Sequence, residues 1–434
     1  MMIWSNIYRV GTIVFLLSGY ASGQVANEFV RVNGKQFEIN GMPYYFVGAN
    51  LWYGAHLAVT DPERLINELD YLQELGISNL RILGAAEGAG EFRIRNSIQP
   101  EPGIINDEIL AGLDFLLSEM AKRDMKAVVY LNNYWVWSGG MAQYVSWDTG
   151  EPYPNPHTET YHWSEFMDFS ARFYSLPQAI EMSHNYIRQF IPRRNSITGI
   201  LYRDDPTIMA WQLANEPRPG RRSPGYADVK GFHDWSGSTA ALIKSLDPNH
   251  LVSTGSEGTI GCLDSDDCYT DAHGVDVDYL TMHVWIKNWN WFDPQRPEET
   301  LPAAKEKVRA YLARHVAIAD SLDKPLVVEE FGCPRDKESY VPDSPVSIRD
   351  DYFKFLFDLI YENASNRGPL AGSNFWAWGG YGKPDQDRTY WGPGDDATGD
   401  PPQEPQGLYS IFASDATTLE IIQRQGQAMR AVKP

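Results

Sequence analysis

Positive charge and long apolar segments are both scarce in this 434-residue sequence. Lys and Arg total 37 against 57 Asp and Glu, a formal net charge of −20. A chain this acidic repels phosphate backbones and anionic lipids, so we expect neither nucleic-acid nor membrane-surface partners. No segment reaches the about 18 uninterrupted apolar residues that a membrane-spanning helix requires. With 43% hydrophobic and 22% charged residues, the composition is that of a globular protein.

Cysteine is also rare, with three residues in the whole chain. Cys262 and Cys268 lie six positions apart in GCLDSDDCY, a spacing that can close a small disulfide loop in an oxidising compartment. A zinc-binding pair is the alternative, although no further His or Cys cluster lies nearby in the sequence. We expect the disulfide, with Cys333 left as a packed free thiol.

The N-terminus has the pattern of a secretory signal peptide. Arg9 precedes the apolar run 10–17, and the small residues at 21–23 suit cleavage. We therefore expect residues 1–23 to be removed and residues 24–434 to form one catalytic domain. The expected location is outside the cytoplasm, secreted or periplasmic, and we expect a monomer.

Short apolar runs alternate with longer stretches of helical period along the rest of the chain. Three helical stretches lie at 61–76, where Asp61 suits the N-cap and Gly76 the C-cap, at 106–124 and at 303–322. The eight strand candidates are 43–50, 78–84, 126–133, 207–216, 251–257, 279–285, 325–332 and 373–379.

Eight buried strands with helices in most of the gaps predict an α/β fold, a (β/α)8 TIM barrel. An open doubly wound sheet is the rival, but no GxGxxG motif follows the first strand. Two long insertions, 134–163 and 383–410, follow the third and eighth strands. We expect both to be enlarged loops at the C-terminal face, where such barrels keep their active sites.

Polar residues cluster where the predicted strands end. They are Arg81, Asn215, Glu216, Glu257, His283, Glu329 and Glu330. A charged side chain at the end of an apolar strand is costly to desolvate unless it is paired or used in chemistry. A buried ion pair explains one such residue, but several around one barrel mouth favour a functional site.

Two carboxylates on opposite sides of a bond are what glycoside hydrolysis requires. One carboxyl, kept protonated, donates to the leaving oxygen, while the other attacks the anomeric carbon or activates water. Their environments must separate the two pKa values. We expect Arg81 to hold one carboxylate ionised, and that negative charge to raise the pKa of the other.

Two motifs resemble glycoside hydrolase family 5 of clan A: WQLANEP at 211–217 and VVEEFG at 327–332. The resemblance implies a retaining (β/α)8 barrel with glutamates at the ends of strands four and seven. Other stretches are similar to the endo-β-1,4-mannanases of that family, so that the likeness runs from about residue 28 to the C-terminus. They are FVGANLWY (46–53), LRILGA (80–85), YLNNYWVWSGGM (130–141), STGSEG (253–258), MHVWIKNWNW (282–291), NFWAWGGYG (374–382) and DPPQEPQGLYSIF (400–412).

Residue by residue, the resemblance implies that Glu216 is the general acid/base and Glu330 the nucleophile. Asn215 then bonds the sugar 2-hydroxyl, Arg81 holds the nucleophile and His283 orients groups near the acid/base. The substrate-binding residues that it implies are Trp52, Arg81, Asn133, Trp135, Asn215, Glu257, His283, Trp285 and Trp376, with Trp376 as the sugar-stacking platform.

Two assignments have a neighbouring rival. Glu329 competes with Glu330, but adjacent strand residues point to opposite sides, and the family's nucleophile directly precedes the aromatic–Gly pair. Trp378 competes with Trp376 in the same way. Trp285 departs from the family pattern, because many members have a tyrosine there whose hydroxyl touches the nucleophile, whereas an indole offers only an N–H.

Further tryptophans are candidates for stacking along the cleft, with a core role as the alternative for each: Trp52, Trp135, Trp137, Trp289 and Trp291.

The implied activity is retaining, endo-acting hydrolysis of mannan, glucomannan or galactomannan without a metal or organic cofactor. Alternatives are an endo-β-1,4-glucanase or other β-glycanase on the same fold and a non-catalytic glycan-binding barrel. A calcium site at the acidic run 264–267 is the weakest reading, because the run lacks the ligand spacing of a known loop.

Overall fold

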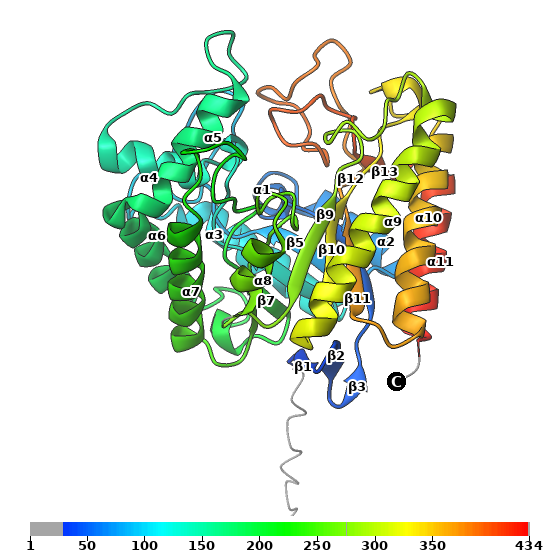
Figure 1. The fold of residues 1–434 in the computed structure, drawn as a ribbon, viewed down its shortest axis with the longest axis horizontal. Helices are drawn as coiled ribbons and strands as arrows, with labels where there is room; N and C mark the ends of the chain where they lie inside the picture. Colours follow the sequence, from blue (N-terminus) through cyan, green and yellow to red (C-terminus); the bar gives the residue numbers. More distant parts are fainter. Residues whose placement is uncertain (1–28, 275, 433–434) are drawn as a thin grey trace, which may run out of the picture.

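The computed structural model describes residues 29–274 and 276–432. The predicted signal peptide, residues 1–23, lies outside them. Eight parallel strands form a nearly closed barrel at the centre, surrounded by helices (Figure 1). In chain order the barrel strands are β4 (Phe46–Asn50), β5 (Asn79–Leu83), β6 (Lys126–Tyr130), β7 (Ile208–Gln212), β8 (Leu251–Ser253), β9 (Leu280–Val284), β10 (Leu326–Phe331) and β11 (Leu370–Phe375).

The sheet runs in the order β8-β7-β6-β5-β4-β11-β10-β9, and every neighbouring pair is parallel. The two strands at the ends of this order, β8 and β9, are connected through two backbone hydrogen bonds in and beside them. The amide of Asp278 donates to the carbonyl of Val252 at 2.8 Å, and the amide of His283 donates to the carbonyl of Glu257 at 3.1 Å. The predicted (β/α)8 barrel is confirmed, and the open doubly wound sheet is not found.

Every residue of the eight barrel strands is buried. Covered by side chains inside and helices outside, such strands have no face exposed to solvent, which explains the mostly apolar runs of the sequence. The eighth strand was predicted at 373–379 but occupies 370–375. The run after it belongs to a separate short strand, β12 (Trp378–Gly380), which pairs with β13 (Ile411–Phe412).

The three predicted helices are present as α2 (Pro62–Glu74), α3 (Asp107–Ala121) and α9 (Pro297–Leu322). The side chain of Asp61 caps α2 by accepting from the amide of Arg64 at 3.0 Å, and Gly76 follows that helix at φ +81°. The helix α9 starts six residues before the prediction, because Pro302 lies within its first two turns and does not end it.

The other helices complete the outer layer. They are α1 (Gly54–Thr60), α4 (Gly140–Thr149), α5 (Trp163–Ala171), α6 (Pro177–Phe190), α7 (Val229–Leu246), α8 (Asp266–Gly274), α10 (Ser347–Ser365) and α11 (Ala416–Arg430), with short 3-10 turns η1 (Val136–Ser138), η2 (Arg172–Ser175), η3 (Tyr202–Asp204) and η4 (Asp336–Glu338). None of the helices among the described residues is long and apolar enough to cross a membrane.

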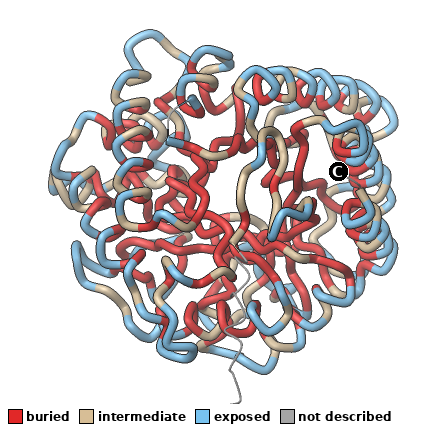
Figure 2. The backbone as a smooth tube through the Cα atoms, turned by 90° about the horizontal axis from the view of Figure 1, so that it is seen from below, coloured by how far each residue is buried: buried red, intermediate tan, exposed pale blue. Residues whose placement is uncertain are grey.

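An N-terminal antiparallel sheet covers the end of the barrel opposite the two long insertions (Figure 1). No pattern in the sequence predicted it. Its strands are β1 (Arg31–Asn33), β2 (Gln36–Ile39) and β3 (Met42–Pro43). The ring of Phe37 packs edge-on against Tyr279, with centroids 5.3 Å apart. Viewed from that end, the buried strands occupy the centre and the exposed residues lie mostly on the outer helices (Figure 2).

The two insertions lie together at the C-terminal end of the barrel (Figure 1). The first, 134–163, was predicted as a loop, but it contains η1 and α4. The second, 383–410, contains no helix or strand. Its shape depends on the buried carboxylate of Asp400, which accepts from the amides of Gly407 and Tyr409 at 2.8 Å each. Both insertions therefore present ordered side chains to the barrel mouth.

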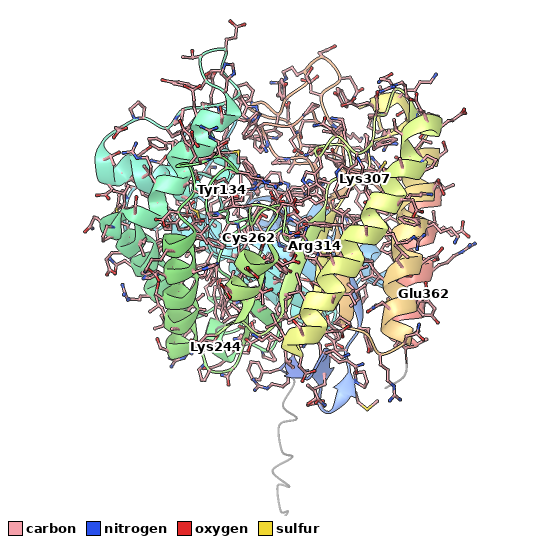
Figure 3. All side chains as sticks on the ribbon, in the orientation of Figure 1. Tyr134, Lys244, Cys262, Lys307, Arg314 and Glu362 are labelled. Carbon is pink, nitrogen blue, oxygen red and sulfur yellow. A yellow bond between two sulfur atoms is a disulfide. The ribbon has the colours of Figure 1, made fainter. Side chains whose placement is uncertain are left out.

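Cys262 and Cys268 form the predicted disulfide, with their Cα atoms 5.7 Å apart (Figure 3 labels Cys262). Cys333 is the buried free thiol, and burial raises its pKa to about 12. Arg314 on α9 pairs with Asp264 at 2.6 Å and with Asp266 at 2.5 Å. Two of the three carboxylates in the acidic run are thus paired with Arg314, which disfavours the calcium hypothesis.

A buried ion cluster joins α10 and the N-terminal end of α11 to the loop that follows β10. Asp415 accepts from Arg335 through both oxygens at 2.8 Å and from Arg349 at 3.3 Å. All three side chains are at most 4% exposed. A buried charge whose partner is removed is strongly destabilising, because water cannot replace the lost interaction.

We expect Asp415→Asn to lower the free energy of unfolding by about 3–5 kcal/mol, since it leaves two buried guanidinium groups without an anion. Chemical denaturation followed by circular dichroism measures the change. Asp358→Asn is the matched control, because its pair with Lys354 is exposed and should contribute little. Equal unfolding midpoints for the two variants would contradict this account.

Candidate active site

A cavity of about 450 Å³ opens at the C-terminal end of the barrel. Its lining includes seven of the residues predicted from the strand-end motifs and the resemblance: Trp135, Asn215, Glu216, Glu257, Trp285, Glu330 and Trp376. Trp137 and Trp289, both candidates for stacking, line it as well. The predicted polar strand ends therefore meet at one site, and the cavity is the candidate active site.

Glu216 and Glu330 face each other across the floor of this cavity. One oxygen of each carboxyl and Nδ1 of His283 all lie within 4.8 Å of one another. Nδ1 of His283 is 2.6 Å from Oε1 of Glu216 and 3.3 Å from Oε2 of Glu330. Carboxyl groups this close leave too little room for a water between the sugar and the second carboxylate, which favours the retaining geometry.

Arg81 connects the floor residues from below and is fully buried. Its Nη1 pairs with Oε1 of Glu330, and its Nη2 donates to Oδ1 of Asn215 at 2.7 Å. Nε donates to Oε1 of Gln212 at 2.8 Å, and Nη1 also reaches Oδ1 of Asn50 at 3.1 Å. One guanidinium therefore fixes the positions of Glu330 and the amide of Asn215.

Local backbone irregularities aim both carboxyl groups. The register between β10 and β9 shifts after Val328, so that one extra residue, Glu329, bulges from the ladder. Bulges of this kind re-aim side chains beside active sites. Glu216 has φ +49°, a left-handed conformation that is unfavourable for a non-glycine residue and that concentrates at functional sites.

As expected, only one of the two neighbouring glutamates lines the cavity, but the bulge shows that the strict alternation of sides behind this expectation is wrong. Glu330 lines the cavity, while Glu329 lies deeper, 3.8 Å from Nε of Arg81, and accepts from Gln212 at 2.5 Å. Strict alternation fails here because the extra residue rotates the strand. Of the two, only Glu330 reaches the space where a sugar can bind.

The two facing carboxyl groups have opposite pKa shifts. For Glu216, burial raises the pKa, but the hydrogen bond and charge of His283 outweigh it and lower the pKa to about 2. Burial raises the pKa of Glu330 well above its usual value, and the charge of Glu216 adds to the rise while Arg81 opposes it. We expected the reverse order, with Glu330 as the more readily ionised group. The pair nevertheless retains one proton over a wide pH range.

A second arginine lies beside the acid/base candidate. Arg218 pairs with Glu257, and its guanidinium stacks 4.8 Å from the ring centroid of Trp135. Trp135 Nε1 donates to Oε2 of Glu216 at 2.5 Å. Burial raises the pKa of Glu257 to about 7, although Arg218 opposes the shift. Trp135 and Arg218 thus form the wall on the Glu216 side.

The indole of Trp285 also points to Glu216, donating to Oε1 at 3.3 Å, and makes no hydrogen bond to Glu330. Glu216, His283 and Glu330 are the group of side chains in the described residues that could hold a metal ion. However, indole N–H groups and Arg81 already point at these carboxylates, and a cation would be repelled by them. The donor set fits proton transfer better than metal binding.

Trp376 rather than Trp378 faces the cavity. Trp378 is fully buried, and its Nε1 donates to Oε2 of Glu68 at 3.1 Å outside the barrel. Trp376 packs edge-on against Trp137 and Trp285, with centroids 6.3 and 6.0 Å apart. Its orientation is therefore fixed by neighbouring rings, as a stacking platform requires.

Several residues expected to bind substrate lie behind the cavity wall. They are Trp52, Arg81, Asn133 and His283, which line no part of the cavity. The Nε1 of Trp52 donates to the carbonyl of Gly399 at 2.8 Å, and Asn133 Oδ1 accepts from Asn215 at 3.1 Å. These side chains orient the lining residues, so we assign them an indirect role. Trp291 likewise does not line the cavity.

The cavity walls also contain residues that the sequence analysis did not name individually: His157, Trp163, Met167, Arg218, Ile260, Asn288, Pro401, Gln403 and Glu404. Oε1 of Gln403 and Oε2 of Glu404 are buried without a hydrogen-bond partner among the described residues. Burial raises the pKa of Glu404 to about 8, and the charge of Asp400 adds to the rise. The sequence of the second insertion is rich in polar residues, but that composition does not show which of its side chains turn toward the cavity.

Comparison with known proteins agrees with this geometry. The model of one protein family, described as GH family 5 beta-mannosidase-like, matches residues 27–433. A putative mannan endo-1,4-beta-mannosidase 4 of Arabidopsis thaliana is 32% identical over 369 residues, covering 80% of this chain and 82% of the relative. The mannan endo-1,4-beta-mannosidase 4 of Solanum lycopersicum is 28% identical, covering 84% and 86%.

Solved structures lead to the same family. A glycoside hydrolase family 5 mannosidase from Rhizomucor miehei has a TM-score of 0.85 at 36% identity and covers 94% of this chain and 99% of its own. An endo-1,4-beta-mannanase from the same organism, at 24% identity and a TM-score of 0.66, covers 93% and 99% and shares the fold. With the match spanning nearly its whole length, the chain belongs to glycoside hydrolase family 5.

Proposed function

We propose that this protein hydrolyses β-1,4-mannosidic bonds inside mannan, glucomannan or galactomannan chains, with retention of configuration. The observation that carries the proposal is the pairing of Glu216 and Glu330 across the cavity floor, within 4.8 Å, with Arg81 on Glu330. The substrate class rests on the relatives, which are named mannan endo-1,4-beta-mannosidases, and on a Rhizomucor miehei variant solved with mannosyl-fructose.

In the first step, Glu330 attacks the anomeric carbon while Glu216 protonates the leaving oxygen. The sugar's positive charge in the transition state favours the ionised form of Glu330, and the shared proton therefore resides on Glu216. Asn215, held by Arg81 at 2.7 Å, presents its amide to the sugar 2-hydroxyl. Trp376 supports the ring face of the same sugar.

In the second step, water replaces the released chain and Glu216 acts as the base. The carboxylate of Glu216 is ionised and can accept a proton from the water, because the hydrogen bonds from His283 and Trp135 favour its ionised form. The water attacks the anomeric carbon from the face that the leaving group vacated, and Glu330 departs as a carboxylate paired with Arg81. Two inversions give net retention.

We further propose that residues 1–23 direct secretion and that residues 24–434 act as one catalytic domain. The disulfide between Cys262 and Cys268 supports an oxidising compartment.

The two glutamate roles can be separated with azide. Glu216→Ala and Glu330→Ala should each lower kcat on mannan by about 100-fold or more. With an aryl β-mannoside, azide should rescue Glu216→Ala with a β-mannosyl azide product and Glu330→Ala with an α-mannosyl azide product, because only the latter has lost the nucleophile. Nuclear magnetic resonance of the products distinguishes them, and exposed Glu306→Ala is the control. The same anomer from both variants would refute the assignment.

The pH profile should be broad. Because the first group of the Glu216–Glu330 pair ionises at about pH 2 and the second well above its usual range, one proton stays on the pair across the region between them. We expect kcat/KM to stay level across the weakly acidic range and to fall at higher pH, when the second proton is lost. Initial rates across this range measure it, and a sharp maximum inside the range would contradict the shared proton.

Exo-action at chain ends is a second candidate function. The matching family is described as beta-mannosidase-like, the 36%-identical structure is named a mannosidase, and Gln403 and Glu404 extend the second insertion to the cavity wall. If the second insertion closes one end of the cleft, only the end of a polysaccharide chain can bind there.

Product analysis separates the two modes. We expect mixed oligosaccharides and an early loss of viscosity from galactomannan, together with little reducing sugar from cellulose. Mannose as the only early product, with viscosity unchanged, would favour exo-action, whereas a preference for cellulose would overturn the mannan assignment.

A further inference from the structure

A second carboxyl group lies behind the proposed nucleophile and is not used by the mechanism above. Glu329 is 1% exposed. Its Oε2 accepts from Gln212 Nε2 at 2.5 Å and lies 3.8 Å from Nε of Arg81, while Oε1 accepts from the hydroxyl of Tyr279 at 3.4 Å. Tyr269 on α8 faces the same charge. Two adjacent carboxyl groups thus share one buried guanidinium.

The charges around Arg81 do not stay balanced during the reaction. A buried guanidinium remains protonated and requires an anion nearby. Glu330 supplies that anion in the reacting state, when the shared proton has moved to Glu216. Once a Glu330 oxygen bonds to the anomeric carbon, the resulting ester is neutral, and Arg81 loses its partner. Arg218 and its carboxylate form a separate pair and do not fill the gap.

We propose that Glu329 is a positioning residue that takes over the ion pair with Arg81 while Glu330 is esterified. The inference rests on the proposed function. In that step the bond from Glu330 to the anomeric carbon forms, the bond to the leaving oxygen breaks, and the proton of Glu216 moves to that oxygen. Glu329 releases its own proton to solvent and becomes the anion of Arg81.

The surroundings of Glu329 suit this exchange. Burial raises its pKa to about 7, while Arg81 opposes the rise, so the carboxyl can gain or lose its proton near neutrality. Its negative charge also raises the pKa of Glu330. Each carboxylate therefore weakens the ion pair between the other carboxylate and Arg81. The bulge in β10 makes the arrangement possible by turning both side chains inward.

Loss of the Glu329 charge should affect the two chemical steps in opposite directions. Without it, the glycosyl-enzyme contains an unpaired guanidinium and is destabilised, so the intermediate forms more slowly. Its breakdown becomes faster, because Arg81 is fully available to the departing Glu330. General damage to the site would instead slow both steps.

The test uses a 2-deoxy-2-fluoro-β-mannosyl fluoride, which traps the covalent intermediate. For Glu329→Gln we expect the second-order rate constant of inactivation to fall at least about threefold and the rate of reactivation by azide to rise at least about threefold. Azide needs no general base, so the titration of Glu216 does not enter. Glu329→Asp keeps a carboxylate and should lie closer to the wild type in both rates.

Rates that fall together, or that both equal those of the wild type, would overturn the inference. If Glu329→Gln does not fold, wild-type reactivation by azide is followed from about pH 5 to about pH 8 at a constant concentration of the azide anion, because in the intermediate Arg81 lowers the pKa of Glu329 below its value in the free enzyme. It should slow as Glu329 ionises and stabilises the intermediate, and a flat profile would overturn the inference. If mass spectrometry detects no covalent glycosyl-enzyme in the wild type, the proposed function itself fails.

Discussion

The buried guanidinium of Arg81 is the interaction on which the site depends. It lies inside the barrel, beneath the cavity, and donates four hydrogen bonds to carboxylate and amide oxygens at the ends of three other strands, β4, β7 and β10. A buried positive charge of this kind is stable only if each donor has a partner. The strands hold the side chains of Glu330, Asn215, Gln212 and Asn50 in fixed positions around Arg81. The need to pair the donors of Arg81 therefore orders the floor of the cavity.

The remaining site is built outward from that floor in two further layers. Tryptophan rings come next: Trp135 and Trp285 donate to Glu216, while Trp376 is held between other rings. The two insertions form the outer layer, which is ordered by its own contacts, such as the amides bound by Asp400. Chemistry is thus set by the rigid strands, and the reach of the site along a polysaccharide is set by the loops.

Much of the fold and of the floor could be predicted from the sequence. Buried parallel strands have continuous apolar runs, so seven of the eight barrel strands were found near their positions, and the polar residues that end those runs marked Arg81, Glu216, His283 and Glu330. Other features could not be predicted. The bulge at Glu329 breaks the alternation from which the sequence argument started. Gln403 and Glu404 belong to an irregular segment without periodicity, so nothing showed that they turn inward.

The sequence by itself predicted the barrel, the family resemblance and the strand ends that carry Glu216 and the Glu329–Glu330 pair, because local periodicity and short motifs encode burial and residue type directly. Only the tertiary structure decided which of Glu329 and Glu330 lines the cavity, which of Trp376 and Trp378 does so, and how close the carboxyl groups of Glu216 and Glu330 lie. These properties depend on distances of a few ångströms between residues far apart in the chain. Such distances follow from how strands and loops pack together, and no local pattern contains them.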